Sequence, residues 1–208
     1  MIPGEAFGVG RASKIEESQL LDSVTNLLWR DGCDSTSIRD IEAEVGIRAP
    51  SIYRRFESRD VLISRCIDRY VDTVVAARID RYLEGDLEPI VGLRRFFLSV
   101  LKPVKGESTP RGCLLTATAG QNAIGVHEVS EAVSRGLRQI EEALTAQGAR
   151  AQLDGDIRPD LEAEALGALL MASFQGFLVL SRAGSLGLSK KVESLFLSIR
   201  PPSPSEAG

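Results

Sequence analysis

The sequence predicts an all-α protein with a small N-terminal helical module and a larger C-terminal helical domain. Apolar residues recur at helical spacing along most of the 208 residues, and no convincing run of alternating apolar and polar residues is present. Glycine and proline interrupt the pattern where helices would end. We expect three parts: a module at 1–59, a domain at 60–200 and a disordered tail at 201–208.

The composition is that of a globular protein, with 43% hydrophobic and 26% charged residues. The formal net charge is -4 and the isoelectric point is about 5.2. These values argue against a protein that coats nucleic acid non-specifically, because that mode needs many cationic contacts. Any binding to DNA must therefore be local.

Cysteine usage and the N-terminus indicate a reducing, cytoplasmic setting. Cys33, Cys66 and Cys113 lie far apart and are odd in number, so they predict neither a disulfide framework nor a metal site. Residues Met1 to Gly10 lack the basic and apolar segments of a secretory signal. We interpret them as a loose tail.

The first helix is expected to run to Gly32. Ser13 and Glu16 have the spacing of a capping box, and apolar residues from Leu20 to Leu28 then follow the helical period.

Two short helices joined by a tight turn follow. Ser37 can cap a helix at about Ile38 to Glu44, with Asp40 favourably placed in its first turn. Gly46 can adopt the left-handed conformation of a tight turn. Pro50 fits only the first turn of a helix, so the next helix should start near Arg48 or Ala49 and end near Phe56.

The rest of the chain reads as further helices. Ser58 can cap a long helix that continues to about Leu83. Later helices are expected at Val91 to Leu101, Cys113 to Ala123, His127 to Gln147, Leu161 to Ala183 and Ser189 to Ile199.

The second of the two short helices has a polar face suited to DNA. Ile52 and Phe56 lie four residues apart and would face the core. The opposite face carries guanidinium, hydroxyl and phenol groups, which suit phosphate oxygens and major-groove base edges: Arg48, Ser51, Tyr53, Arg54 and Arg55. Positive charge is concentrated there, since residues 48–59 have a net charge of +3 (four Arg, one Glu), whereas residues 1–59 have -2 (eight Lys or Arg, ten Asp or Glu).

The same features also allow simpler interpretations. Two short helices around a glycine turn can be an ordinary helical corner. Exposed arginines are often only solvated, Tyr53 could be a half-buried packing residue, and Arg59 could merely pair with a carboxylate.

The order and spacing of about fifty residues resemble the N-terminal signature of the tetracycline-repressor (TetR) family. The matching runs are Gly32-Cys-Asp-Ser-Thr-Ser-Ile-Arg-Asp-Ile41, Val45-Gly-Ile47 and Ser51-Ile-Tyr-Arg-Arg-Phe-Glu-Ser-Arg-Asp-Val-Leu62. The resemblance implies three short DNA-binding helices followed by a larger helical domain that dimerises and usually binds a small effector.

The resemblance also implies individual roles. Ser37 matches a phosphate-contacting position, and Arg39 matches one that can reach a base. Tyr53 matches the phosphate-contacting aromatic residue, and Arg59 the cation at the start of the fourth helix. The second of the two short helices matches the family's recognition helix, the one that enters the major groove. Its front is formed by Arg48, Ala49, Pro50 and Ser51, and Arg54 and Arg55 match further contact positions.

Two residues depart from the family pattern. Glu42 stands where a small residue usually lets the two short helices approach, and Cys33 stands where an aromatic residue is usual. These departures put in doubt the angle between the helices and the packing of the first helix.

The larger domain predicts a pocket and a dimer interface. Apolar walls with a few polar groups point to a small-molecule site formed by Phe96, Phe97, Thr116, Gln121, Met171, Phe174 and Gln175, although an aromatic residue or methionine at helical spacing more often belongs to the core. The helices near 127–147 and 161–183 resemble the family's dimerisation pair. Small residues would permit close helix approach, either between subunits or within one: Gly167, Ala168, Ala172 and Gly176.

Enzyme and membrane functions are not favoured. His127 is the only histidine and has no recognisable triad or metal partners, so we predict no catalytic residue, metal or cofactor. The apolar run from Ala165 to Leu180 is shorter than the roughly 20 residues that a bilayer requires. We expect it to be a buried helix.

The sequence therefore predicts a homodimeric regulator, by default a repressor, whose recognition helices enter successive major grooves of a palindromic operator. The alternative is a helical ligand-binding or scaffold protein that does not bind an operator.

Overall fold

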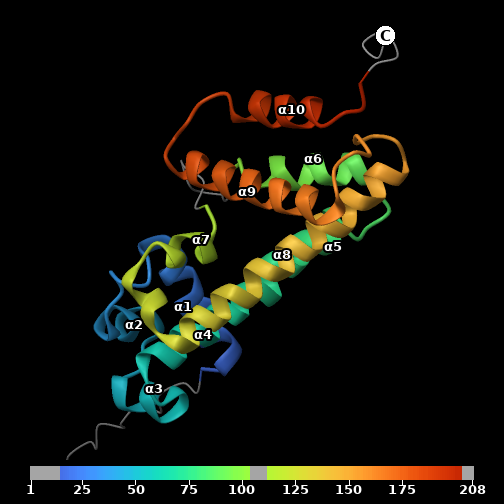
Figure 1. The fold of residues 1–208 in the computed structure, drawn as a ribbon. Coiled ribbons are helices and arrows are strands. Elements are labelled where there is room, and N and C mark those ends of the chain that lie inside the picture. The colour runs from blue at the N-terminus through green and yellow to red at the C-terminus, as the bar shows by residue number, and fades with distance from the viewer. Residues whose placement is uncertain (1–14, 104–111, 203–208) are drawn as a thin grey trace, which may run out of the picture.

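The computed structural model describes residues 15–103 and 112–202, and within these residues every regular element is a helix (Figure 1). This confirms the all-α prediction. The chain forms a small group of helices at one end and a larger bundle that extends to the other end.

The N-terminal helices are α1 (Glu17–Asp31), α2 (Ile38–Val45) and α3 (Ala49–Phe56). Helix α1 begins directly after Glu16, whose side chain makes no capping hydrogen bond. A capping box that starts at Ser13 would place Glu16 in the first turn of the helix, but Glu16 precedes α1. The predicted capping box is therefore wrong, and Ser13 itself lies outside the described residues.

The predicted long helix from Ser58 to Leu83 is continuous but not uniform. It consists of α4 (Arg59–Tyr70), a π-helical segment η1 (Val71–Val75) and α5 (Ala76–Tyr82). Ser58 caps it as predicted, because its hydroxyl accepts a hydrogen bond from the Val61 N–H at 3.1 Å. The apolar pattern gave no sign of the π-helical segment.

The larger bundle contains the remaining helices. They are α6 (Pro89–Ser99), α7 (Leu114–Ala119), the 3₁₀ helix η2 (Asn122–Gly125), α8 (His127–Leu153), α9 (Ala163–Arg182) and α10 (Leu188–Ser198). The predicted helix from Cys113 to Ala123 is thus two shorter elements, and α8 continues beyond the predicted end at Gln147. Most of the predicted tail, from 203 onward, lies outside the described residues.

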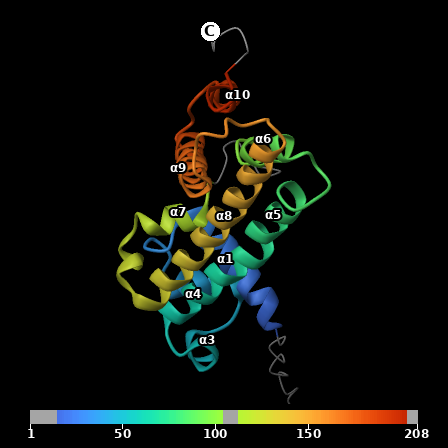
Figure 2. The same ribbon diagram turned by 45° about the vertical axis from the view of Figure 1, so that its right-hand side comes forward.

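Helices α4 and α8 run side by side through the middle of the molecule (Figures 1 and 2). Gly136 permits α8 to approach η1 and α7 closely, since a Cβ there would lie 2.6 Å from Val71 of η1 and 2.8 Å from Leu115 of α7. At the far end, α6, α9 and α10 share an aromatic core in which the Phe97 ring contacts the rings of Phe174, Phe177 and Phe196.

Helix α9 is long and apolar enough to cross a membrane by length and composition alone, with a mean hydropathy of 1.6. Only 33% of that apolar window is buried within the protomer. The expectation of a buried helix therefore holds for one face of α9, and the opposite face is exposed.

Candidate nucleic-acid interface

The start of α2 is fixed by a reciprocal pair of side-chain hydrogen bonds. The Asp40 N–H donates to the Ser37 hydroxyl at 3.3 Å, and the Asp40 carboxylate accepts the Ser37 N–H at 2.8 Å. The hydrogen bonds from Ser37 lower the pKa of Asp40. Ser37 and Arg39 are both exposed at this end of the helix, as a contact with DNA requires.

Glu42 bridges α2 and α3. Its carboxylate accepts a hydrogen bond from the Ala49 N–H at 2.6 Å, at the first turn of α3. Gly46 makes the turn between them with a φ of 68°, in the left-handed region that glycine tolerates. Glu42, which departs from the family pattern, thus accepts one of the free N–H groups in the first turn of α3.

Helix α3 buries one face and exposes the other. Ile52 and Phe56 are in the core, as predicted. Arg48, Pro50, Tyr53 and Arg54 are exposed, while Ala49, Ser51 and Arg55 are half-buried. Part of the hydrogen-bonding capacity of Arg55 is used within the protein, because its Nη1 donates to the Ile15 carbonyl at 3.2 Å.

Arg59 makes several hydrogen bonds within the protein, which its position in the sequence did not indicate. Its guanidinium donates to the carbonyl oxygens of Cys33 and Thr36, the latter at 2.8 Å, and its side chain is 30% exposed. These bonds hold the loop that precedes α2.

The structure brings three of the predicted contact residues together around one cleft. Ser37, Tyr53 and Arg59 line a cleft of about 530 Å³ beside the loop at 34–38. The Tyr53 phenol is a donor that a phosphate oxygen can accept. The Ser37 hydroxyl already donates to the Asp40 carboxylate, and Nε and Nη2 of Arg59 already donate to backbone carbonyls. Asn122 from the larger bundle also lines this cleft, and sequence reasoning did not foresee it.

Polar contacts join the α1–α2 loop to the segment that follows α7. The Gln121 side-chain oxygen accepts the N–H groups of Cys33 and Asp34 at 2.8 and 3.2 Å. The Asp34 carboxylate accepts the N–H groups of Asn122 and Ala123 at 2.7 and 3.0 Å, and the Asn122 bonds lower the pKa of Asp34. No sequence signal could have revealed these contacts, because the partners are almost ninety residues apart.

The cysteines of this region are buried and packed. The Cys33 thiol lies 3.3 Å from the Thr118 hydroxyl, and burial raises its pKa. Burial also raises the pKa of Cys66 to about 12. Cys33 therefore fills the position of the expected aromatic residue as a protonated packing group. Among the described residues, no group of three or more His, Cys, Asp or Glu could hold a metal ion.

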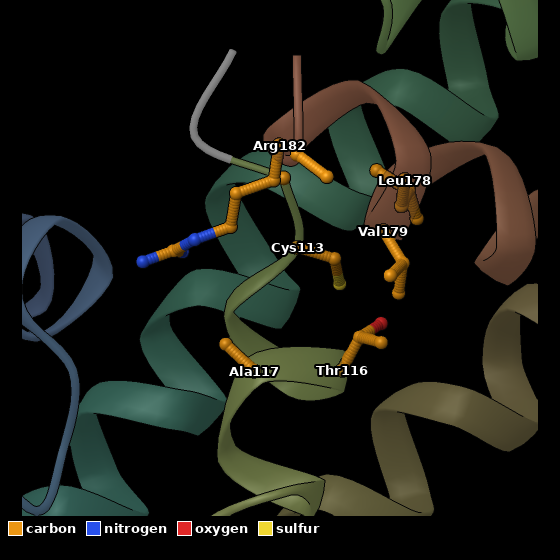
Figure 3. A pocket seen from close by; sticks show the side chains of 8 residues that line it. Cys113, Thr116, Ala117, Leu178, Val179 and Arg182 are labelled. Atoms are coloured by element: carbon orange, nitrogen blue, oxygen red, sulfur yellow. The ribbon is translucent and has the colours of Figure 1, made fainter. Parts of the chain in front are cut away.

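A separate cavity of about 280 Å³ lies between α7 and α9 (Figure 3). Its walls are mainly apolar and are formed by Gly112, Cys113, Thr116, Ala117, Leu178, Val179, Arg182 and Ala183. The Arg182 guanidinium points away from Thr116, so the arginine contributes mainly its aliphatic stem (Figure 3).

Of the seven predicted pocket residues, Thr116 alone lines this cavity. Thr116 donates a hydrogen bond to Gln175, whose amide lies 3.5 Å from the Met171 sulfur. Phe96, Phe97 and Phe174 pack on one another in the core, and Gln121 belongs to the contacts with the α1–α2 loop.

Two family models match the chain. Residues 20–66 match the model described as "Bacterial regulatory proteins, tetR family", and residues 89–186 match "Tetracyclin repressor-like, C-terminal domain". Curated relatives include the HTH-type transcriptional repressor ComR of Escherichia coli (strain K12), which is 22% identical over 85% of this chain and 84% of ComR. The repressor DhaR of Mycobacterium sp. (strain GP1) is 21% identical over 77% of this chain and 79% of DhaR.

Solved structures share the fold. The reduced form of NemR from E. coli has a TM-score of 0.77 at 15% identity and covers 89% of this chain and 96% of NemR. A cysteine mutant of the regulator CifR, complexed with a 26-base-pair operator duplex, has a TM-score of 0.73 at 20% identity and covers 91% of this chain and 97% of CifR.

The Glu42 cap can be tested by substitution. Glu42→Ala removes the acceptor for the Ala49 N–H, so we expect the free energy of unfolding to fall by roughly 0.5–2 kcal/mol, as for the loss of other helix caps. Glu42→Gln keeps an acceptor oxygen and should lose less. Urea unfolding followed by circular dichroism measures both.

Glu44→Ala is the matched control, because Glu44 is exposed on the same helix. An equal loss of stability in Glu42→Ala and Glu44→Ala would show that Glu42 does not act as a cap.

Proposed function

Because the chain belongs to the TetR family and is a DNA-binding transcriptional regulator, we propose that it is a homodimeric repressor that binds a palindromic operator and is released by a small-molecule effector. The observation that carries this proposal is the exposure of Arg48, Tyr53 and Arg54 on α3, at the opposite end of the molecule from α10 (Figure 1). A recognition helix must be accessible in this way to enter a major groove.

We propose that the ten residues predicted from the sequence contact DNA. Their expected contributions differ, because their side chains differ in exposure and in the hydrogen bonds they already make. Arg48, Tyr53 and Arg54 on α3, with Ser37 and Arg39 at the start of α2, offer exposed side chains. Ala49, Pro50 and Ser51 would allow the front of α3 to approach the bases closely. The guanidinium groups of Arg55 and Arg59 already donate hydrogen bonds within the protein. Only their remaining N–H groups would be available to DNA.

A second copy of the chain is the proposed partner for the exposed face of α9. The exposed apolar residues on this side are Ala165, Ala168, Leu169, Ala172, Gly176, Val179 and Leu180, with Ala183 directly after the helix. Glu164 and Arg182 are exposed near the two ends of the helix, and Val179 and Ala183 also line the cavity between α7 and α9. Gly176 has nothing within 4 Å of where its Cβ would lie, whereas a Cβ at Gly167 would overlap Thr145 on α8. Gly167 therefore serves packing within the protomer, and Gly176, Ala168 and Ala172 are available for close approach between subunits.

We propose residues 1–59 as the DNA-binding domain and 60–200 as the effector and dimerisation domain of a cytoplasmic protein. The boundary falls at the start of α4, which Ser58 caps. The apolar cavity between α7 and α9 is the proposed effector site, and its walls fit a small molecule that is mainly apolar.

Operator binding tests the role of Arg54. If the Arg54 guanidinium reads a base, we expect Arg54→Ala to weaken operator binding by about 1–3 kcal/mol. If it contacts a phosphate, we expect the magnitude of the slope of the logarithm of the binding constant against the logarithm of the salt concentration to fall by about one. A salt titration of protein against an operator duplex, with scrambled competitor DNA, distinguishes the two.

Lys190→Ala removes a positive charge from exposed α10 at the other end of the molecule and is the control. If Arg54→Ala and Lys190→Ala bind the operator as well as the unchanged protein, Arg54 does not contact the operator.

The dimer interface is tested by placing a charge at the centre of the α9 face. Ala172→Glu would bury an uncompensated carboxylate between subunits, a cost of several kcal/mol. We expect monomers in sedimentation velocity. Ala77→Glu, on an exposed position of α5, should leave the dimer intact. Dimers of unchanged stability in both variants would contradict the α9 interface.

The effector cavity is tested with 8-anilinonaphthalene-1-sulfonate, an anionic dye whose aromatic rings fluoresce when they enter an apolar site. Ala117→Phe would fill the cavity from α7, so we expect weaker dye fluorescence with operator binding retained. Ala119→Phe, on the exposed side of the same helix, is the control. Equal dye binding by both variants would place the dye outside this cavity.

A further inference from the structure

Two side chains tie the DNA-binding helices to the larger bundle in opposite directions. Gln121, after α7, accepts hydrogen bonds from the backbone N–H groups of Cys33 and Asp34. Asp34, in the α1–α2 loop, accepts hydrogen bonds from the backbone N–H groups of Asn122 and Ala123, and from the Asn122 side-chain amide at 3.0 Å. We call this pair, Asp34 and Gln121, the interdomain clamp.

The clamp acts on a loop that is otherwise rigid. The Thr36 hydroxyl donates to the Gly32 carbonyl at 2.7 Å, and Arg59 binds the Thr36 carbonyl at 2.8 Å. Gly32 has a φ of 91°, and a Cβ there would lie 2.8 Å from Nε2 of Gln121. The loop therefore cannot shift without breaking several hydrogen bonds at once.

The loop leads directly into the recognition module. Only Ser35 and Thr36 separate Asp34 from Ser37, the N-cap of α2, and α2 holds α3 through the Glu42–Ala49 hydrogen bond at 2.6 Å. A displacement of the loop would therefore carry α2 and α3 with it. On this side the clamp is joined by two further contacts to the larger bundle: the Cys33 thiol lies 3.3 Å from the Thr118 hydroxyl, and Nε1 of Trp29 donates to the Gly112 carbonyl at 3.3 Å.

We propose that Asp34 and Gln121 are positioning residues, which fix the orientation of α2 and α3 within each protomer and so set the half-site separation that the dimer accepts. This inference rests on the proposed homodimer. In such a dimer the two recognition helices must match successive major grooves about 34 Å apart, so a rotation of either module changes the separation that fits. Neither residue needs to touch DNA for this role.

The test uses an operator duplex selected by the unchanged protein from random-sequence DNA. A series of duplexes is then made in which the distance between the half-sites changes by one base pair at a time. We expect the affinity of the unchanged protein to be roughly tenfold or more higher at one separation than at the neighbouring separations. This difference is about as large as the effect of one or two unfavourable base-pair changes in an operator. Asp34→Ala and Gln121→Met, which each remove one half of the clamp, should flatten this preference to within about threefold.

Asp31→Ala is the matched control, since it removes the same charge three residues away, where the carboxylate pairs with neighbouring Arg30. Thermal unfolding monitors whether each variant keeps its helices, and Gln121→Met carries the test if Asp34→Ala does not fold.

The outcomes are distinguishable. If both clamp variants lose affinity equally at every separation and keep the preference of the unchanged protein, the clamp is merely structural and the inference is overturned. If the unchanged protein itself shows no preferred separation, the proposed two-headed dimer fails, and the inference fails with it.

Discussion

The packing of α4 between α1 and α8 is the interaction on which the rest of the structure depends. Its residues Leu62, Ile63, Cys66 and Ile67 are completely buried, and each large aliphatic side chain contributes on the order of 1.5–3 kcal/mol. On one side the Thr25 hydroxyl of α1 donates to the Cys66 carbonyl at 3.1 Å. On the other side α8 lies along α4, so a single helix belongs to the cores of both domains.

Charge distribution complements this arrangement. The chain is acidic as a whole, yet residues 48–59 carry a net charge of +3 and include the exposed face of α3. Because the chain as a whole is acidic, electrostatics favours the approach of DNA to this basic segment over other orientations. In the proposed mode of binding, the local excess of arginine would contribute to the orientation of docking as well as to affinity.

Local rules made much of the DNA-binding module predictable. Ser37 and Ser58 cap helices, Gly46 has positive φ and Pro50 lies in a first turn, because each depends on residues within four positions. Long-range relations were not predictable. Gln121 was interpreted as a pocket residue, but its partners lie almost ninety positions away, and Phe97 and Phe174 proved to contact each other. Glu42 was recognised only as a departure, because its role as a cap depends on the position of α3.

The interdomain clamp has a consequence for how this protein could diverge or be re-engineered. Apart from the Asn122 side-chain amide, each of its hydrogen bonds joins one of two side chains to backbone N–H groups, which every residue except proline supplies. The clamp itself thus specifies little sequence beyond Asp34 and Gln121, whereas the neighbouring contacts of the junction also use the side chains of Cys33, Thr118 and Trp29. If the clamp sets the orientation as proposed, a DNA-reading module from another family member would keep that orientation on this bundle only when the incoming loop brings a carboxylate at the position of Asp34.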